Sequence, residues 1–251
     1  MARQGPGVVS FETGLRVLEA FDRESPRLTL GELAARCGIT RYAARRYMNS
    51  LMGLGYATSD GKRYFLTPRV LRAGSVYLSD SPILAKLQPL LHQLTAEIEE
   101  STYLSVIDGD KTLVIAKATV NRITNRSHSL GAHFPLFVTS AGLAISASLP
   151  SAELDGLLAR YRPLAFTGGT LMNPKDILAE VALTRNRGFA VSERQLDDLV
   201  RGIAVPLRDM QGNLVGAISA NMFIGNESAE ASVLRVLGGL RRTAELASAQ
   251  L

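Results

Sequence analysis

Basic and polar side chains suited to nucleic-acid recognition recur at helical spacing within residues 41–54. At about 100° per residue, one arc of this segment contains no acidic residue and consists of Arg41, Tyr42, Arg45, Arg46 and Asn49. Guanidinium groups bind phosphates or the O6 and N7 atoms of guanine, and an asparagine amide suits adenine. We therefore predict that this arc faces DNA, with a merely solvated face as the alternative.

The opposite arc of the same segment is apolar and predicts packing against two shorter helices. Its members are Ala43, Ala44, Tyr47, Met48, Leu51 and Leu54. The first of the shorter helices is predicted near residues 11–22, where Leu15, Leu18 and Phe21 recur at helical spacing.

Capping signals divide this region into a helix-turn-helix. Thr29 and Glu32 form a capping box that starts the second helix, and Gly38 ends it. Thr40 then caps the segment 41–54, which places it beside the DNA-facing residues. Cys37 lies in the compact turn and is predicted to be a small buried residue.

A short hairpin is predicted directly after these helices. Residues 56–58 and 63–66 read as strands, and Asp60-Gly61 between them is a strong turn signal. Lys62 and Arg63 stand at its tip, where they can contact phosphate or the minor groove. Helices followed by a basic hairpin predict a winged helix-turn-helix domain over residues 1–70.

The charge distribution agrees with this assignment. Residues 1–80 carry 12 of the 28 Lys and Arg residues but only 7 of the 23 Asp and Glu residues, so the whole excess of +5 lies there. A polyanion-binding head is the interpretation we favour, and chance clustering is the alternative.

The length of 251 residues suits about two domains. No membrane span or signal peptide is expected, and a single cysteine fits the cytoplasm.

The remainder of the chain predicts an α+β fold. A linker helix is expected over residues 71–82, followed by a C-terminal domain over 83–251 with a mostly antiparallel sheet and helices around it. The expected strands are 102–107, 111–117, 121–129, 189–192, 202–207 and 214–223, and the later helices are 140–149, 152–161, 174–187 and 228–249.

Motifs of catalysis are not found in the sequence. It has no Gly-x-Ser-x-Gly elbow, no Walker A loop, no Gly-x-Gly-x-x-Gly after a strand and no histidine pair at helical metal-ligand spacing. We therefore predict no catalytic residue, no cofactor and no metal site. An enzyme acting on a small organic acid with an appended nucleic-acid-binding domain is one alternative, and a passive architectural DNA binder is another.

Four segments resemble IclR-type bacterial transcriptional regulators: LTLGELAARCGITRYAARRYMNSLMGLGY, DGKRYFLTPRVLRAG, LGAHFPLFVTSAGLAISA and GFAVSERQLDDLVRGIAVPLRDMQGNLVGAISA. They are most similar to the branch that controls breakdown of protocatechuate, 4-hydroxybenzoate and related aromatic acids. The resemblance implies a winged helix, a linker helix and a GAF-like effector domain with a curved antiparallel sheet. It also implies a homodimer or a dimer of dimers that binds operator DNA and a small organic acid, which we expect to be an aromatic carboxylate.

The resemblance further implies an effector site between the sheet and the loop entering the small-residue helix. By position its residues are Ser140, Ala141, Ser192, Gly202, Ser219 and Asn221. The residues themselves add that Ser219 and Asn221 share one strand face, where a ligand or structural hydrogen bonds could satisfy them. An anionic effector also favours a cation, and the nearest candidates in sequence are Arg122, Arg126 and His133.

Overall fold

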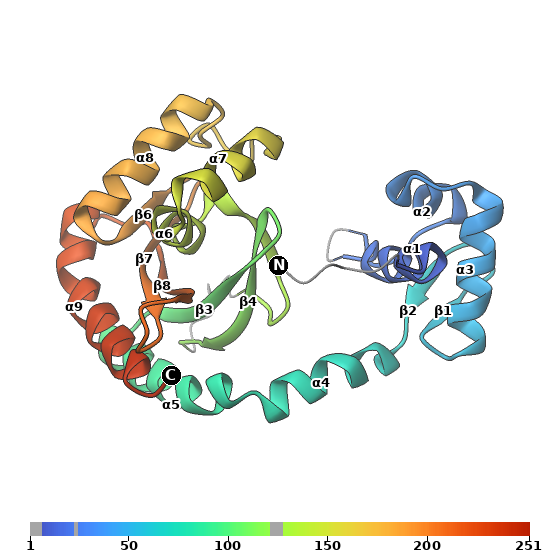
Figure 1. Ribbon diagram of the computed structural model, residues 1–251, viewed down its shortest axis with the longest axis horizontal. Helices are drawn as coiled ribbons and strands as arrows, with labels where there is room; N and C mark the ends of the chain where they lie inside the picture. Colours follow the sequence, from blue (N-terminus) through green and yellow to red (C-terminus); the bar gives the residue numbers. More distant parts are fainter. Residues whose placement is uncertain (1–6, 23–24, 121–127) are drawn as a thin grey trace. The chain divides into compact units, whose positions relative to one another are not determined.

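The computed structural model describes residues 7–22, 25–120 and 128–251. The chain divides into two compact units, Met1–Ser79 and Asp80–Leu251, and each is described by itself (Figure 1).

Three helices and a two-stranded hairpin form the first unit. They are α1 (Val9–Glu19), α2 (Leu30–Cys37), α3 (Arg41–Gly53), β1 (Ala57–Ser59) and β2 (Tyr64–Leu66). The buried core of the unit joins all three helices and consists of Val17, Leu28, Leu30, Leu33, Ala34, Cys37, Ala44, Met48 and Ala57. The helix-turn-helix and the hairpin are thus confirmed.

The predicted caps are present in this unit. Thr29 Oγ1 accepts a hydrogen bond from the Glu32 amide, and the Glu32 carboxylate accepts one from the Thr29 amide at 2.7 Å. Gly38 ends α2 with a φ of 64°, a conformation in which a side chain would be strained. Thr40 Oγ1 accepts from the Ala43 amide and starts α3.

Two helices of this unit differ in extent from the sequence-based predictions. The first helix begins at Val9 and ends at Glu19 rather than covering 11–22, because the spacing of apolar side chains does not fix the residues at which a helix starts and stops. The last helical residue of α3 is Gly53, and Leu54 is 59% exposed rather than part of the packed arc. The chain turns away at this point, since Gly55 adopts a φ of 77°.

A short 3-10 turn (Pro68–Val70) leads into α4 (Leu71–Asp80), which occupies most of the predicted linker segment. No residue of α4 is buried. The next helix, α5 (Pro82–Ile98), begins two residues after α4 ends and continues through Pro89.

The second unit is built on a curled six-stranded sheet in the order β5-β4-β3-β8-β7-β6, with every neighbouring pair antiparallel (Figure 1). Its strands are β3 (Ser101–Asp108), β4 (Lys111–Ala118), β5 (His133–Pro135), β6 (Ala190–Glu193), β7 (Val200–Arg208) and β8 (Leu214–Phe223). The predicted α+β class and antiparallel sheet are confirmed.

Helices cover both faces of this sheet. On one face lie α5 and α9 (Ala229–Ser248), whose apolar residues pack with Ile218 and Ala220 of β8. On the other lie α6 (Ser140–Ser148), α7 (Ser151–Arg160) and α8 (Pro174–Arg187), which pack with Ala217. Alternation along β8 therefore directs even-numbered residues to α5 and α9, and odd-numbered residues to α6.

One predicted strand is not found as expected. Of residues 121–129, positions 121–127 lie outside the described residues, and 128 and 129 are not in a strand. The neighbour of β4 is instead β5, where Leu113 pairs with His133 and Lys111 pairs with Pro135. The strand at this edge of the sheet is therefore set by pairing between β4 and a segment that is distant in the chain. The local pattern of residues does not record such a pairing.

Candidate nucleic-acid interface and effector site

The two arcs of α3 are separated by burial as the sequence predicts. Ala44 and Met48 are fully buried against α1 and α2. The side chains of the basic arc are exposed, namely Arg41, Tyr42, Arg45, Arg46 and Asn49. Burial of the apolar arc holds the helix in place, so the basic arc is presented to solvent without any rearrangement.

The α3 arginines are also free of internal ion pairs. Among the residues that the structure describes, no carboxylate lies within 4.0 Å of the guanidinium groups of Arg41, Arg45 or Arg46. Two arginines elsewhere in the unit are ion-paired: Arg36 lies 2.7 Å from Asp22, and Arg27 lies 3.5 Å from Asp60. Within the described residues, the α3 arc therefore presents three arginine side chains that no carboxylate neutralises.

Backbone hydrogen bonds shape the hairpin tip. Asp60 Oδ1 accepts from the amides of Arg63 at 2.7 Å and Lys62 at 3.0 Å, and these bonds hold the pKa of Asp60 below its usual range. Lys62 is exposed at the tip. The Arg63 guanidinium donates to the Arg27 carbonyl at 3.1 Å and lies 3.8 Å from Glu32, so it is tied to its own unit more than Lys62 is.

In the second unit, strand register aligns small and polar residues into one row. Ser192 pairs with Gly202, Gly202 with Asn221, and Asn221 with Ser101, across the strands β6, β7, β8 and β3. We call Ser192, Gly202, Asn221 and Ser101 the polar row. It lies on the α6 face, because Asn221 is odd-numbered like Ala217.

The first residue of α6 closes against this row. A Cβ at Gly202 would lie 2.5 Å from Ser140 Oγ and 3.1 Å from Asn221 Oδ1, so a larger residue there would require the Ser140 and Asn221 side chains to shift. Ser192 Oγ donates to the Val138 carbonyl at 2.9 Å and fixes the loop that enters α6. Ala141 is buried beside Ser140.

Aromatic rings adjoin the polar row on the same face. Ser219 lies two residues before Asn221 and pairs with Tyr103, which is 2% exposed. The His128 ring lies 5.2 Å from the Tyr103 ring and 4.2 Å from that of Phe134. Burial raises the pKa of Tyr103, which keeps its hydroxyl protonated.

Hydroxyl and amide groups therefore stand next to aromatic rings, an arrangement that can bind a small molecule with a planar ring and a polar end. The sequence analysis did not single out Tyr103 or Phe134. The available signal was the aromatic side chain at the second position of the strand 102–107, which alternation places on one face with Ser105.

The α6 face therefore brings together six of the predicted effector-site residues, namely Ser140, Ala141, Ser192, Gly202, Ser219 and Asn221. His133 does not lie with them. It is exposed on β5, its Nε2 lies 2.9 Å from Asp108 Oδ2, and its pairing with Leu113 places it on the α5 face. Arg122 and Arg126 lie outside the described residues.

Comparison with known families identifies both units. The profile of the IclR helix-turn-helix domain matches residues 10–61, and that of the bacterial transcriptional regulator IclR C-terminal domain matches residues 75–249. The chain belongs to the IclR family. It is a DNA-binding transcriptional regulator with an effector-binding C-terminal domain.

Individual members of the IclR family are similar over most of their length. The Pca regulon regulatory protein of Pseudomonas putida is 34% identical over 219 residues, covering 87% of this chain and 75% of that protein. The p-hydroxybenzoate hydroxylase transcriptional activator of Acinetobacter baylyi is 28% identical, covering 94% and 89%. An IclR homologue of Microbacterium hydrocarbonoxydans, solved in complex with 4-hydroxybenzoate, has a TM-score of 0.75 at 20% identity, covering 96% and 98%.

Neither a membrane-spanning helix nor a metal-binding cluster is present in the part of this IclR-family chain that the structure describes. No helix there is long and apolar enough to cross a membrane. No group of three or more His, Cys, Asp or Glu residues in the same part of the chain could hold a metal ion.

Proposed function

We propose that this IclR-family protein controls transcription by reading an operator with α3 and sensing an aromatic carboxylic acid on the α6 face of its C-terminal sheet. The observation that carries the proposal is the separation of α3 into a buried apolar arc and an exposed arc whose arginines have no carboxylate partner among the described residues. The protein acts in this proposal as a regulator without turnover of the small molecule, in the cytoplasm where its operator lies.

In this proposal α3 enters the major groove. The base-contacting residues are Arg41, Tyr42, Arg45, Arg46 and Asn49, and the phosphate contacts come from Thr40, Lys62 and Arg63. Because Arg63 is already bonded to Arg27 and near Glu32, we assign the larger share of the wing's affinity to Lys62.

The proposed effector contacts are Ser140, Ala141, Ser192, Gly202, Ser219 and Asn221, with Tyr103 and Phe134 as the aromatic wall. Support comes from the site chemistry and from the relatives whose names refer to p-hydroxybenzoate and to the Pca regulon. The structural neighbour that holds 4-hydroxybenzoate adds to it. Arg122 stays a prediction for the carboxylate, and His133 is omitted because it lies on the other face.

Self-association is the third part of the proposal, and it rests on α4. A ten-residue helix is marginal in water unless it packs on a partner, yet no residue of α4 is buried. Leu71 is 68% exposed and Leu78 is 45% exposed, and the seven-residue spacing places both on one face. A second copy of the chain is the partner we propose, so that each copy reads one half-site of the operator.

One experiment tests the DNA-binding and effector-binding parts together. The purified protein is mixed with promoter-region duplex DNA, and a thermal-shift panel of 4-hydroxybenzoate, benzoate and 2-oxo acids is run with product analysis. We expect duplex binding, a rise in melting temperature with 4-hydroxybenzoate and no product. Turnover of the acid would favour the enzyme alternative, and DNA binding without a ligand response would favour an architectural protein.

A further inference from the structure

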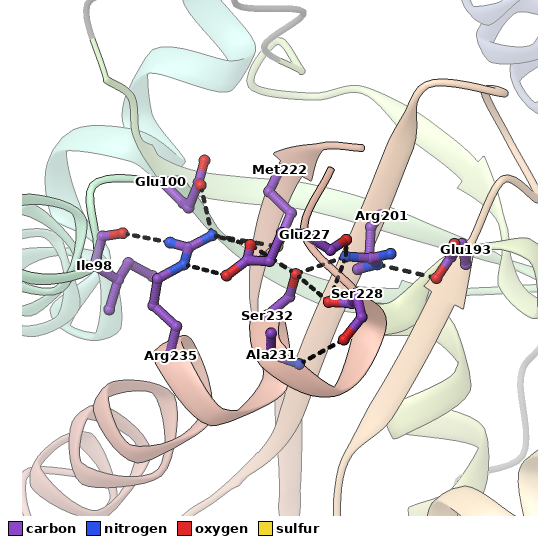
Figure 2. Close-up of polar contacts among 10 residues, drawn as sticks. All are labelled: Ile98, Glu100, Glu193, Arg201, Met222, Glu227, Ser228, Ala231, Ser232 and Arg235. Atoms are coloured by element: carbon purple, nitrogen blue, oxygen red, sulfur yellow. Dashed lines mark hydrogen bonds and ion pairs between the residues drawn. The ribbon is translucent and has the colours of Figure 1, made fainter. Parts of the chain in front are cut away.

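A network of charged side chains lies directly behind the polar row, on the α5 and α9 face of the same strands. Glu193, Arg201 and Met222 are the chain neighbours of Ser192, Gly202 and Asn221, and they pair with one another in the adjacent register row. Figure 2 shows these residues reaching toward the start of α9. Every strand residue of the network thus shares a peptide bond with a residue of the polar row.

Arg201 fastens β6 and β7 to the start of α9. Its Nε lies 3.0 Å from Glu193 Oε2, and its Nη1 donates to the carbonyls of Glu227 and Ser228 and, at 2.6 Å, to Ser232 Oγ. The residue is only 3% exposed. A buried guanidinium left without these acceptors is strongly unfavourable, so Arg201 and the start of α9 must move together.

Arg235 continues the connection from α9 to the end of α5. Its Nε and Nη2 bind the two carboxylate oxygens of Glu227 at 3.1 and 3.0 Å, a bidentate pair (Figure 2). Nη1 donates to the carbonyl of Ile98, the last residue of α5, and Nη2 also binds Glu100 at 3.0 Å. Glu227 is shared, because its Oε2 also accepts from Ser232, which binds Arg201.

We propose that Arg201, Glu227 and Arg235, the arginine network, couple occupation of the polar row to α5 and hence to the linker helix α4. The inference rests on the proposed function. Ser140 Oγ and Asn221 Oδ1 already lie close to Gly202, so a ligand that binds beside Gly202 would have to move these side chains or the strands that carry them. Arg201 passes that displacement to the start of α9, and Arg235 passes it to the end of α5.

The route from α5 onward is covalent. α5 begins at Pro82, and only Ser81 separates it from the last residue of α4. A helix transmits a displacement of one end to the other through its hydrogen-bonded backbone, from which only the amide donor of Pro89 is missing inside α5. The arginine network is therefore a positioning device that reports the effector to the DNA-binding unit without touching either ligand.

The test replaces Glu227, the shared acceptor, with glutamine in the full-length protein. Two quantities are measured: the dissociation constant for 4-hydroxybenzoate, and the ratio of operator dissociation constants with and without saturating 4-hydroxybenzoate. We expect Glu227→Gln to bind 4-hydroxybenzoate with a dissociation constant within about threefold of that of wild type. The ratio of operator dissociation constants should move toward one by a factor of about five or more. Arg235→Lys, which loses the bidentate geometry, provides a second variant should the first fold poorly.

The matched control is Glu97→Gln. Glu97 pairs with Arg242 and joins the same two helices, α5 and α9, but both side chains are exposed and neither contacts the sheet network. This variant keeps the wild-type ratio. Linkage adds a second readout. In each protein, operator DNA must change the affinity for 4-hydroxybenzoate by the same factor by which 4-hydroxybenzoate changes the affinity for operator DNA.

The outcomes separate the two proposals. A wild-type ratio in folded Glu227→Gln and Arg235→Lys overturns the coupling role, and so does an equal loss in Glu97→Gln. Loss of 4-hydroxybenzoate binding in the folded variants overturns it as well, because the network would then support the site rather than transmit from it. A wild-type protein that binds DNA but gives no response to the acid instead overturns the proposed effector function.

Discussion

Gly202 of β7 and Ser140 at the start of α6 approach so closely that a methyl group at position 202 would lie 2.5 Å from Ser140 Oγ. The contact joins the sheet to the helix that covers it, at the centre of the proposed effector site. Because this contact is already closely packed, a larger residue at position 202 would require neighbouring atoms to move. It also means that the space available to a ligand is set by the position of α6.

Gly202→Ala should therefore destabilise the second unit and weaken binding of 4-hydroxybenzoate. We expect a loss of about 1–3 kcal/mol in the free energy of unfolding, typical of an overpacked site. Urea denaturation measures it. Adding Ser140→Ala removes the nearer clashing atom and should restore part of the loss, because Ser140 Cβ lies at 3.2 Å from the added methyl. Equal stability of Gly202→Ala and wild type would contradict the geometry.

Arg45→Ala should weaken operator binding by about 1–3 kcal/mol if the side chain reads a base bidentately, and Arg41→Ala should behave alike. Fluorescence anisotropy on operator and random duplexes measures both. Arg160→Ala, an exposed arginine of the second unit, is the control and should bind as wild type does. Wild-type affinity of both α3 variants on both duplexes would remove α3 as the recognition helix.

Ser219→Leu combined with Asn221→Leu should abolish the thermal shift produced by 4-hydroxybenzoate. Both side chains project onto the α6 face, and leucine there removes hydrogen-bonding groups and fills space. Operator affinity without the acid serves as the internal control and should not change. A thermal shift of wild-type size in the double variant would place the ligand elsewhere in the protein.

Acid should weaken the first unit through its capping box. The Thr29 amide and hydroxyl lower the pKa of Glu32 below its ordinary 4.5. A carboxyl whose folded-state pKa is lowered stabilises the fold above its unfolded-state pKa, and this stabilisation is lost as the pH falls through the folded-state pKa. Glu32→Gln keeps a capping side chain but does not titrate. The thermal midpoint of wild type should exceed that of the variant at neutral pH, and the difference should shrink below about pH 4. A constant difference would refute the assignment.

Leu71→Glu with Leu78→Glu should convert the protein to a monomer, because two charges would then lie on the α4 face that we assign to the partner copy. Light scattering coupled to gel filtration measures the mass. Ala73→Glu adds a charge to the opposite face of the same helix and should leave the assembly intact. Equal masses for the wild type and the Leu71, Leu78 variant would exclude this interface.

Local interactions explain why the first unit could be predicted in most of its detail. The Thr29–Glu32 capping box, the Asp60-Gly61 turn and the two arcs of α3 each depend on residues close together in the chain. Leu54 was assigned to the wrong environment because periodicity continues past the residue where a helix ends. Fraying and tertiary contacts decide such ends, and the spacing of side chains does not record them.

The sequence by itself indicated the class of the protein, the exposed basic arc of α3 and the strand on which Ser219 and Asn221 share a face. Tertiary structure alone decided that Ser192, Gly202, Asn221 and Ser101 form one row, since they come from four strands and their alignment depends on register. It also decided that His133 belongs to the other face and that Arg201 and Arg235 meet at Glu227. Helices and turns are stabilised by neighbours along the chain, whereas a sheet is stabilised by partners that are distant in it.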